Sequence, residues 1–160
     1  MTRLLLPRTA VDAIADDVAH YGKQRLETGA LLLAKPGDTT VTTVAIAGTA
    51  GVTRGYGRFV LAMPVIDQLF TFAETNSLQV VAHVHSHGRG AFLSVIDRTG
   101  IIRMTGFIAA VIPTFATPPR DPTRWGWWTF RDGDWHDLPA AVMTDDDAVA
   151  VVTVDAGGVR

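Results

Sequence analysis

The sequence predicts an α/β domain, because stretches with helical spacing alternate with short apolar stretches. Apolar residues recur every three or four positions in 9–21 and 64–76, as they do in amphipathic helices. Residues 28–34, 41–47 and 107–112 form short, mainly apolar runs, which are typical of buried strands. Of the 160 residues, 48% are hydrophobic and 19% are charged, so a single domain can fill a sizeable core.

Charge and composition exclude several classes of function. The net charge of −2 and the lack of a Lys/Arg block argue against a nucleic-acid-binding surface. The chain has no cysteine, which excludes disulfides, thiol catalysis and cysteine-type zinc sites and fits a cytoplasmic protein. The opening apolar run, Leu4-Leu5-Leu6, is too short for a signal peptide, and no later run could span a membrane. We therefore expect neither export nor a membrane partner.

The first helix is expected to begin at a capping box made by Thr9 and Asp12 and to end at Gly22. Two strands should follow at 28–34 and 41–47, because turn residues separate the two apolar runs.

Residues 48–57 are rich in glycine and small side chains, which predicts a mobile loop. The glycines are ordinary loop composition or, alternatively, belong to a flexible lid. Arg54 and Arg58 are expected to be solvated, although they could meet an acidic partner. Pro64 suits the first turn of a second helix, which should run to about Asn76.

The C-terminal third contains strand signals. Residues 125–130 should pair with a return strand at Trp135 through a turn at 131–134, whose sequence is Arg-Asp-Gly-Asp. The four tryptophans of this region are expected to cover the sheet, although they could instead form a ligand platform.

The chain is divided into a single domain, 1–138, and a C-terminal tail or extra edge strand, 139–160. Three consecutive acids at 145–147 should form a solvated turn, and the apolar run 149–154 suggests the added strand.

Three histidines mark the predicted functional site. The apolar run 78–82 predicts a strand, and His83, His85 and His87 follow it at every second position. Side chains alternate between the faces of a strand, so the three imidazoles point the same way and two of them can bind one metal ion. This alternation alone allows either the pair 83/85 or the pair 85/87.

A glycine-rich turn then returns Ser94 and Asp97 towards the histidines. Two histidines and one aspartate leave a fourth tetrahedral position open, which is the pattern of a catalytic zinc site. Ser94 and Asp97 also fit a capping box that opens a short helix, and the two roles can coexist. Such a site would carry a net charge near +1 and would benefit from a separate base. Glu27, an isolated acid at the head of an apolar strand, is the candidate.

Together these residues resemble the JAMM signature of the JAB/MPN-domain metalloproteases. The matching parts are Glu27-Thr28-Gly29, His85-Ser86-His87 and Ser94-x-x-Asp97, and the resemblance extends to about Trp128. Six residues separate the second histidine from the serine, whereas the commonest form has seven, and Gly88 stands where a proline is usual.

A shorter bacterial branch of the family has six residues in that loop and an apolar strand that ends in Ile-Pro or Val-Pro. The run 107–113, Phe-Ile-Ala-Ala-Val-Ile-Pro, is similar to that strand.

The resemblance implies a cytidine-deaminase-like MPN fold, in which helices flank a mixed, mostly antiparallel sheet. It implies one Zn²⁺ per chain, held by His85, His87 and Asp97, with Glu27 as the base and the Ser94 hydroxyl as an oxyanion donor. Ser86 between the histidines and the turn directly after His87 favour the pair 85/87. His83 would then either support the metal ligands from behind or, as we expect, be a packed core residue.

The implied activity is that of a metal-dependent (iso)peptidase that cuts after the C-terminus of a ubiquitin-like protein. The implied partners are that protein or its conjugates, together with homologues of activating and conjugating enzymes. Two alternatives remain open at this point: a catalytically silent MPN scaffold, which would typically lack some of these residues, and a zinc amidohydrolase that acts on a small amide.

Overall fold

A mixed eight-stranded sheet forms the centre of the computed structural model, which describes residues 3–100, 102–146 and 148–160. The strand order is β12-β11-β3-β2-β6-β7-β8-β9. Two neighbouring pairs, β11–β3 and β6–β7, are parallel, and the others are antiparallel. The strands of this sheet are β2 (Gly29–Ala34), β3 (Val41–Ala47), β6 (Gln79–Ser86), β7 (Ile108–Ile112), β8 (Gly126–Arg131), β9 (Asp134–Asp137), β11 (Ala150–Asp155) and β12 (Gly158–Val159).

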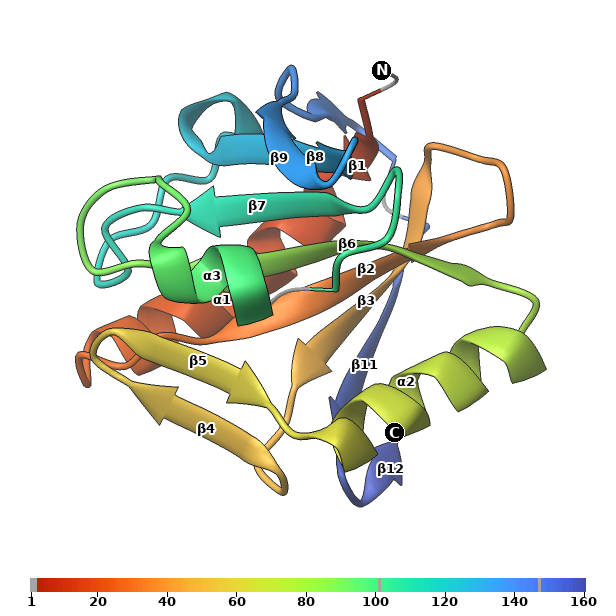
Figure 1. Cartoon of the computed structure of the whole chain (residues 1–160), viewed down its shortest axis with the longest axis horizontal. Helices are drawn as coiled ribbons and strands as arrows, with labels where there is room; N and C mark the ends of the chain where they lie inside the picture. Colours follow the sequence, from red (N-terminus) through yellow and green to blue (C-terminus); the bar gives the residue numbers. More distant parts are fainter. Residues whose placement is uncertain (1–2, 101, 147) are drawn as a thin grey trace.

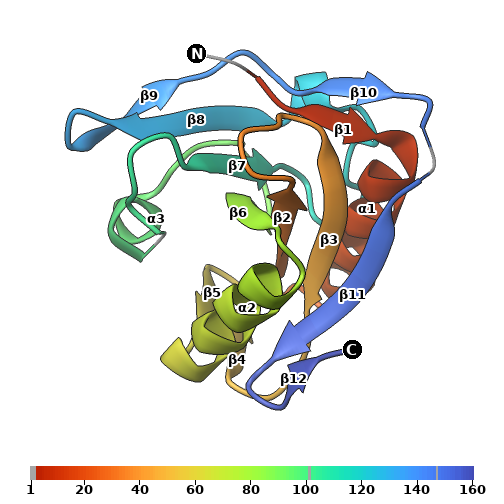
Figure 2. The same cartoon turned by 90° about the vertical axis from the view of Figure 1, so that its right-hand side faces the viewer.

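Helices cover both faces of the sheet, as Figures 1 and 2 show. The remaining elements are α1 (Arg8–Gly22), α2 (Met63–Thr75), α3 (Val95–Gly100), the 3₁₀ turn η1 (Pro122–Arg124), the parallel pair β1 (Leu5–Pro7) and β10 (Val142–Thr144), and the hairpin β4 (Val52–Gly55) and β5 (Arg58–Leu61).

The leucines of β2 show how the two layers share the sheet. Successive side chains point to opposite faces, so Leu32 belongs to the core under α1, whereas Leu31 and Leu33 belong to the core under α2. All six residues of β2 are buried, because layers cover both of its faces. The strand next to the site is therefore fixed from both sides.

Several expected elements are confirmed. The strand expected at 41–47 is β3, and the second helix has Pro64 in its first turn. The hairpin expected after 125 is β8–β9, with Asp132 (φ 52°) and Gly133 (φ 77°) at its turn. These two positive φ angles are those of a type I′ turn, in which glycine carries no steric cost.

Two expected local structures are wrong. The first helix begins at Arg8, directly after Pro7, and makes no side-chain cap hydrogen bond, because Thr9 already lies inside the first turn. Asp12 pairs with Arg120 instead, with its carboxylate 3.0 Å from the guanidinium. The segment expected to be a mobile loop contains β4 and the start of the ordered hairpin β4–β5.

The C-terminal segment adds two strands to the large sheet, since β11 pairs with β3 and β12 pairs with β11. The division of the chain at residue 138 stays a prediction. Of the acids at 145–147, Asp147 lies outside the described residues, as do Met1, Thr2 and Ile101. Among the helices of the described ranges, none is both long and apolar enough to cross a membrane.

Candidate metal centre

The antiparallel pairing of β2 with β6 brings the acid and the histidines together. Gly29 pairs with His85, so Glu27, two residues before β2, meets the end of β6. His87 lies just past that end, where its backbone N–H donates to the carbonyl of Ile112 in the neighbouring strand. Glu27, His85 and His87 are all buried, with exposed fractions of 5%, 2% and 7%.

One ligand atom each from Glu27, His85 and His87 lies within 4.8 Å of the others, so these residues are close enough to hold a metal ion. Asp97 also lies beside both imidazoles. Its Oδ1 is 3.2 Å from Nε2 of His85, its Oδ2 is 3.0 Å from Nε2 of His87, and the two Nε2 atoms are 3.1 Å apart.

These separations fit a zinc ion. Zinc–ligand bonds of about 2.0–2.1 Å at tetrahedral angles place neighbouring ligand atoms about 3.3 Å apart. Two imidazole nitrogens and a carboxylate are also a donor set that zinc prefers. His85, His87 and Asp97 therefore present a cation-binding geometry, while Glu27 lies close by as a second carboxylate.

The cap of α3 fixes Asp97. The backbone N–H of Ser94 donates to Oδ2 of Asp97 at 2.9 Å, and the backbone N–H of Asp97 donates to Oγ of Ser94 at 3.0 Å. This reciprocal pair is the expected capping box. The same aspartate contacts both histidines, so its cap role and its place at the centre coexist.

Burial and charge shift the pKa values of the site. Burial raises the pKa of Glu27 to about 7, although His87 opposes the shift and Asp97 adds to it. Burial also opposes ionisation of Asp97, but hydrogen bonds from His85 and His87 outweigh that effect and hold the pKa of Asp97 well below its usual range. For His87, burial lowers the pKa, yet the hydrogen bond to Asp97 and the charge of Glu27 raise it overall. Within one cluster the two carboxylates thus differ strongly in proton affinity.

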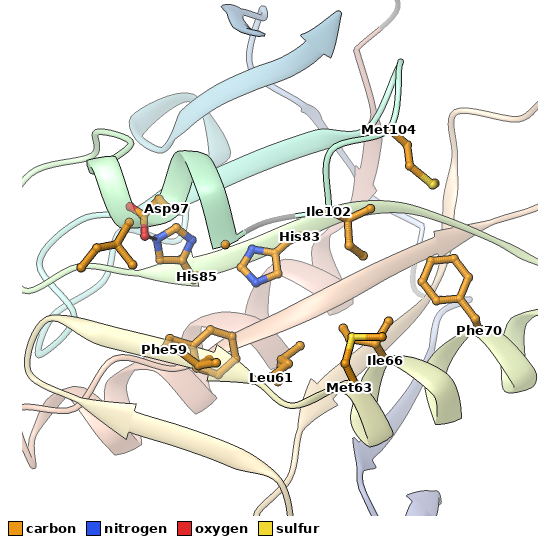
Figure 3. A pocket seen from close by; sticks show the side chains of 13 residues that line it. Phe59, Leu61, Met63, Ile66, Phe70, His83, His85, Asp97, Ile102 and Met104 are labelled. Carbon is orange, nitrogen blue, oxygen red and sulfur yellow. Dashed lines mark ion pairs between the residues drawn. The ribbon is translucent and has the colours of Figure 1, made fainter. Parts of the chain in front are cut away.

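Two cavities border this centre. The larger, of about 400 Å³, has mainly apolar walls from β5, α2, α3 and the segment before β7, and includes His85 and Asp97 in its lining. Figure 3 shows Phe59 and Leu61 on one side and Ile102 and Met104 on the other. The smaller, of about 270 Å³, is lined by Glu27, Tyr56, Gly57, His87, Gly88, Arg89, Gly90, Phe92 and Ser94. A substrate that crosses the centre would have room on both sides.

His83 lies two residues before His85 in β6, opposite Leu31, and is not part of the close group. Its ring lies between those of Phe59 and His85, with centroids 5.8 Å and 5.4 Å away, and its Nδ1 has no partner among the described residues. Burial lowers its pKa to about 3, so the ring is neutral. His83 is therefore a wall of the larger cavity and not simply a packed core residue.

Sequence reasoning missed the contribution of the β4–β5 hairpin. Phe59 and Leu61 line the larger cavity and Tyr56 lines the smaller one. The sequence does contain a usable signal, because Val52-Thr53 and Phe59-Val60 are strand-forming pairs on either side of a turn at Tyr56-Gly57. The neighbouring glycines obscure this pattern.

No protein-family model matches the chain, and no curated protein sequence matches it. Several solved structures, however, are similar to the chain. A JAB1/MPN domain protein from Archaeoglobus fulgidus matches with a TM-score of 0.52 and 16% identity, covering 90% of this chain and 100% of that one. A protein from Desulfitobacterium hafniense has a TM-score of 0.70 at 11% identity, covering 89% of this chain and 94% of that one. One from Salinibacter ruber has a TM-score of 0.53 at 19% identity, covering 91% and 94%. The fold predicted from the signature residues, that of a JAB1/MPN domain, is confirmed.

Proposed function

We propose that this JAB1/MPN-fold protein is a zinc-dependent (iso)peptidase that hydrolyses the bond after the C-terminus of a ubiquitin-like protein. The observation that carries the proposal is the convergence of Glu27, His85, His87 and Asp97 beside two cavities. Such an enzyme would act in the cytoplasm, beside homologues of activating and conjugating enzymes.

His85, His87 and Asp97 would hold one Zn²⁺ per chain. When bound, zinc supplies Lewis-acid polarisation of the scissile carbonyl and of water. The low pKa of Asp97 keeps this carboxylate ionised and able to bind a cation throughout the neutral range.

Glu27 would act as the base. It accepts a proton from the attacking water, and a pKa near neutrality suits a group that must both take up and release a proton. Amine leaving groups require that proton, because even the lysine ammonium has a pKa of about 10.4 and its amide anion would leave very poorly. Glu27 therefore returns the proton to the leaving nitrogen.

Ser94 would stabilise the oxyanion of the tetrahedral intermediate. Its Oγ accepts the backbone N–H of Asp97, so the hydroxyl proton remains free to be donated. Ser94 lines the same small cavity as Glu27 and His87, which favours a position of its hydroxyl beside the reacting atoms.

The cavities favour a peptide substrate over a small amide. The larger one has mainly apolar walls and a volume of about 400 Å³, and the smaller one borders Glu27 and His87, so a substrate that extends into both cavities has more contacts than a small amide would have. An extended segment with apolar residues could lie in the larger cavity and reach the centre. A catalytically silent scaffold is less well supported, because such scaffolds typically lack the metal ligands or the glutamate. This chain has all five signature residues: Glu27, His85, His87, Ser94 and Asp97.

The test is cleavage by the zinc-loaded protein of two probes: a peptide whose Gly-Gly end is linked to a lysine side chain, and a proteome-derived peptide library read by mass spectrometry. We expect cleavage that stops on chelation and returns with zinc. Glu27→Gln should retain one zinc per chain and lose about 10³-fold or more in rate. Binding of the probes without any cleavage would instead indicate a scaffold, and cleavage that survives verified metal removal would contradict the mechanism.

A further inference from the structure

Arg54, in β4 close to the turn of the β4–β5 hairpin, is half-buried, and each of its three guanidinium nitrogens donates a hydrogen bond. Its Nη1 donates to the carbonyl of Gly48 at 2.7 Å, its Nη2 to that of Ala47 at 2.6 Å, and its Nε to Oγ1 of Thr28 at 3.0 Å. The guanidinium also lies over the ring of Tyr21, 4.0 Å from the centroid. The expectation of a solvated arginine is therefore wrong, because Arg54 joins the hairpin to β3, α1 and the start of β2.

Thr28 connects Arg54 to both halves of the metal centre. It follows Glu27 directly, and its Oγ1 donates to Oδ2 of Asp17 at 3.2 Å. Its backbone N–H donates to Oγ of Ser86 at 2.9 Å, and its carbonyl accepts the N–H of Ser86 at 2.9 Å. Ser86 stands between His85 and His87, so the backbone that carries the base is joined to the backbone that carries the histidines.

The hairpin also holds Glu27 directly. The backbone N–H of Glu27 donates to the carbonyl of Gly55 at 2.9 Å, and Gly55 is the residue after Arg54. Phe59, on the return strand, packs so tightly against Gly29 that a Cβ there would lie 2.6 Å from its ring. Any shift of the hairpin would therefore displace the backbone at Glu27.

We propose that Arg54 is a positioning residue, which holds Glu27 in place against the histidine pair by fixing the hairpin and Thr28. The planar guanidinium is required because it serves three acceptors in a fixed fork while its face packs on Tyr21. A lysine ammonium could reach only part of this set.

The effect of Arg54 on catalysis rests on the proposed function of Glu27. Its effect on the position of Glu27 can be tested without any activity. Arg54→Met and Arg54→Lys are compared with Arg58→Gln, an exposed arginine of the same hairpin that makes no ion pair or side-chain hydrogen bond among the described residues. NMR hydrogen exchange should show the amide of Glu27 exchanging at least tenfold faster in Arg54→Met, less so in Arg54→Lys and unchanged in Arg58→Gln. Amides in the middle of β2 should not change. An unchanged Glu27 amide would overturn the proposal. If Arg54→Met does not fold, the comparison of Arg54→Lys with Arg58→Gln decides the question.

A double-mutant cycle with Glu27→Asp separates positioning from general stability. With the Gly-Gly isopeptide as substrate, Arg54→Lys should lower kcat about tenfold and leave KM within twofold. In the Glu27→Asp background the same change should have little further effect, since the base is already displaced. Fully additive losses would overturn the positioning role. If hydrogen exchange at Glu27 changes as expected but neither the natural sequence nor any variant cleaves a probe, the proposed function fails. The proposal that Arg54 positions Glu27 then still holds.

Discussion

Asp97 has two sets of partners, and together they explain how a short helix can hold a carboxylate beside the two histidines. The backbone of Ser94 orients one carboxylate oxygen, while both oxygens face the imidazoles of His85 and His87. A flexible aspartate would lose rotamer freedom on binding a cation, but the cap has already removed much of that freedom. The site is therefore largely preorganised.

The choice of histidines is testable one residue at a time. His85→Ala and His87→Ala should each lower bound zinc from about one per chain to nearly none, because each removes a nitrogen from the close group. His83→Ala should retain the zinc, since His83 only lines the cavity. Metal analysis of the purified variants measures this. Zinc lost from His83→Ala but kept in His87→Ala would mean that the metal binds two residues further back along β6.

Ser94 can be examined in the same way. If its hydroxyl donates to the oxyanion, Ser94→Ala should lower kcat by about 10²-fold with KM nearly unchanged. The lost cap should also cost about 1 kcal/mol of unfolding free energy. Steady-state kinetics beside thermal melts separate the two effects. A stability loss of this size with full activity per folded molecule would leave Ser94 with its cap role alone.

At the scale of elements, α2 and β5 form one wall of the apolar cavity. Met63, at the start of α2, is 67% exposed at the cavity rim. In Met63→Lys an ammonium would meet the apolar part of the peptide, so we expect KM to rise about tenfold while kcat is kept, a loss of about 1.4 kcal/mol of binding. Val142→Lys, on β10 outside the lining, is the control. Equal effects of both substitutions would exclude the cavity as a binding site.

Elements with strong periodicity can be predicted from sequence, and those fixed by distant contacts cannot. The short, mainly apolar run of β3 and the Asp-Gly turn of β8–β9 are local signals, and the structure confirms both. The β4–β5 hairpin depends on Arg54 reaching Ala47 of β3 and on Phe59 packing against Gly29, which no local pattern reveals. Residue types predict a metal-binding group, but not that His83 borders a cavity.

At the scale of the whole molecule, the C-terminal strands are connected to the site through Asp155. Its carboxylate accepts hydrogen bonds from Nη1 and Nη2 of Arg160, at 3.0 and 2.6 Å. It also accepts hydrogen bonds from the backbone N–H groups of Gly157 and Thr49. Thr49 follows Gly48, whose carbonyl binds Arg54. The end of the chain thus supports the loop that anchors the hairpin.

This arrangement gives a pH-dependent contribution to stability. The hydrogen bonds from Arg160, together with those from Gly157 and Thr49, hold the pKa of Asp155 below its ordinary value of 3.8. The unfolded chain therefore binds this proton more readily than the folded one. The stabilisation is present above about pH 4 and is lost as the pH falls below that value.

Replacing Asp155 tests this contribution. The melting temperature of Asp155→Asn should lie well below that of the natural sequence at pH 7, and the gap should narrow as the pH falls below about 4, because the unfolded natural chain then takes up a proton that the folded carboxylate does not bind. Asp145→Asn is the matched control, since Asp145 pairs with Arg8 at the surface and its side chain is 94% exposed. Its gap should stay near zero at every pH, because exposed ion pairs contribute little. A gap for Asp155→Asn that does not change with pH would mean that the lost contacts, and not the charge of Asp155, hold the C-terminal strands in place.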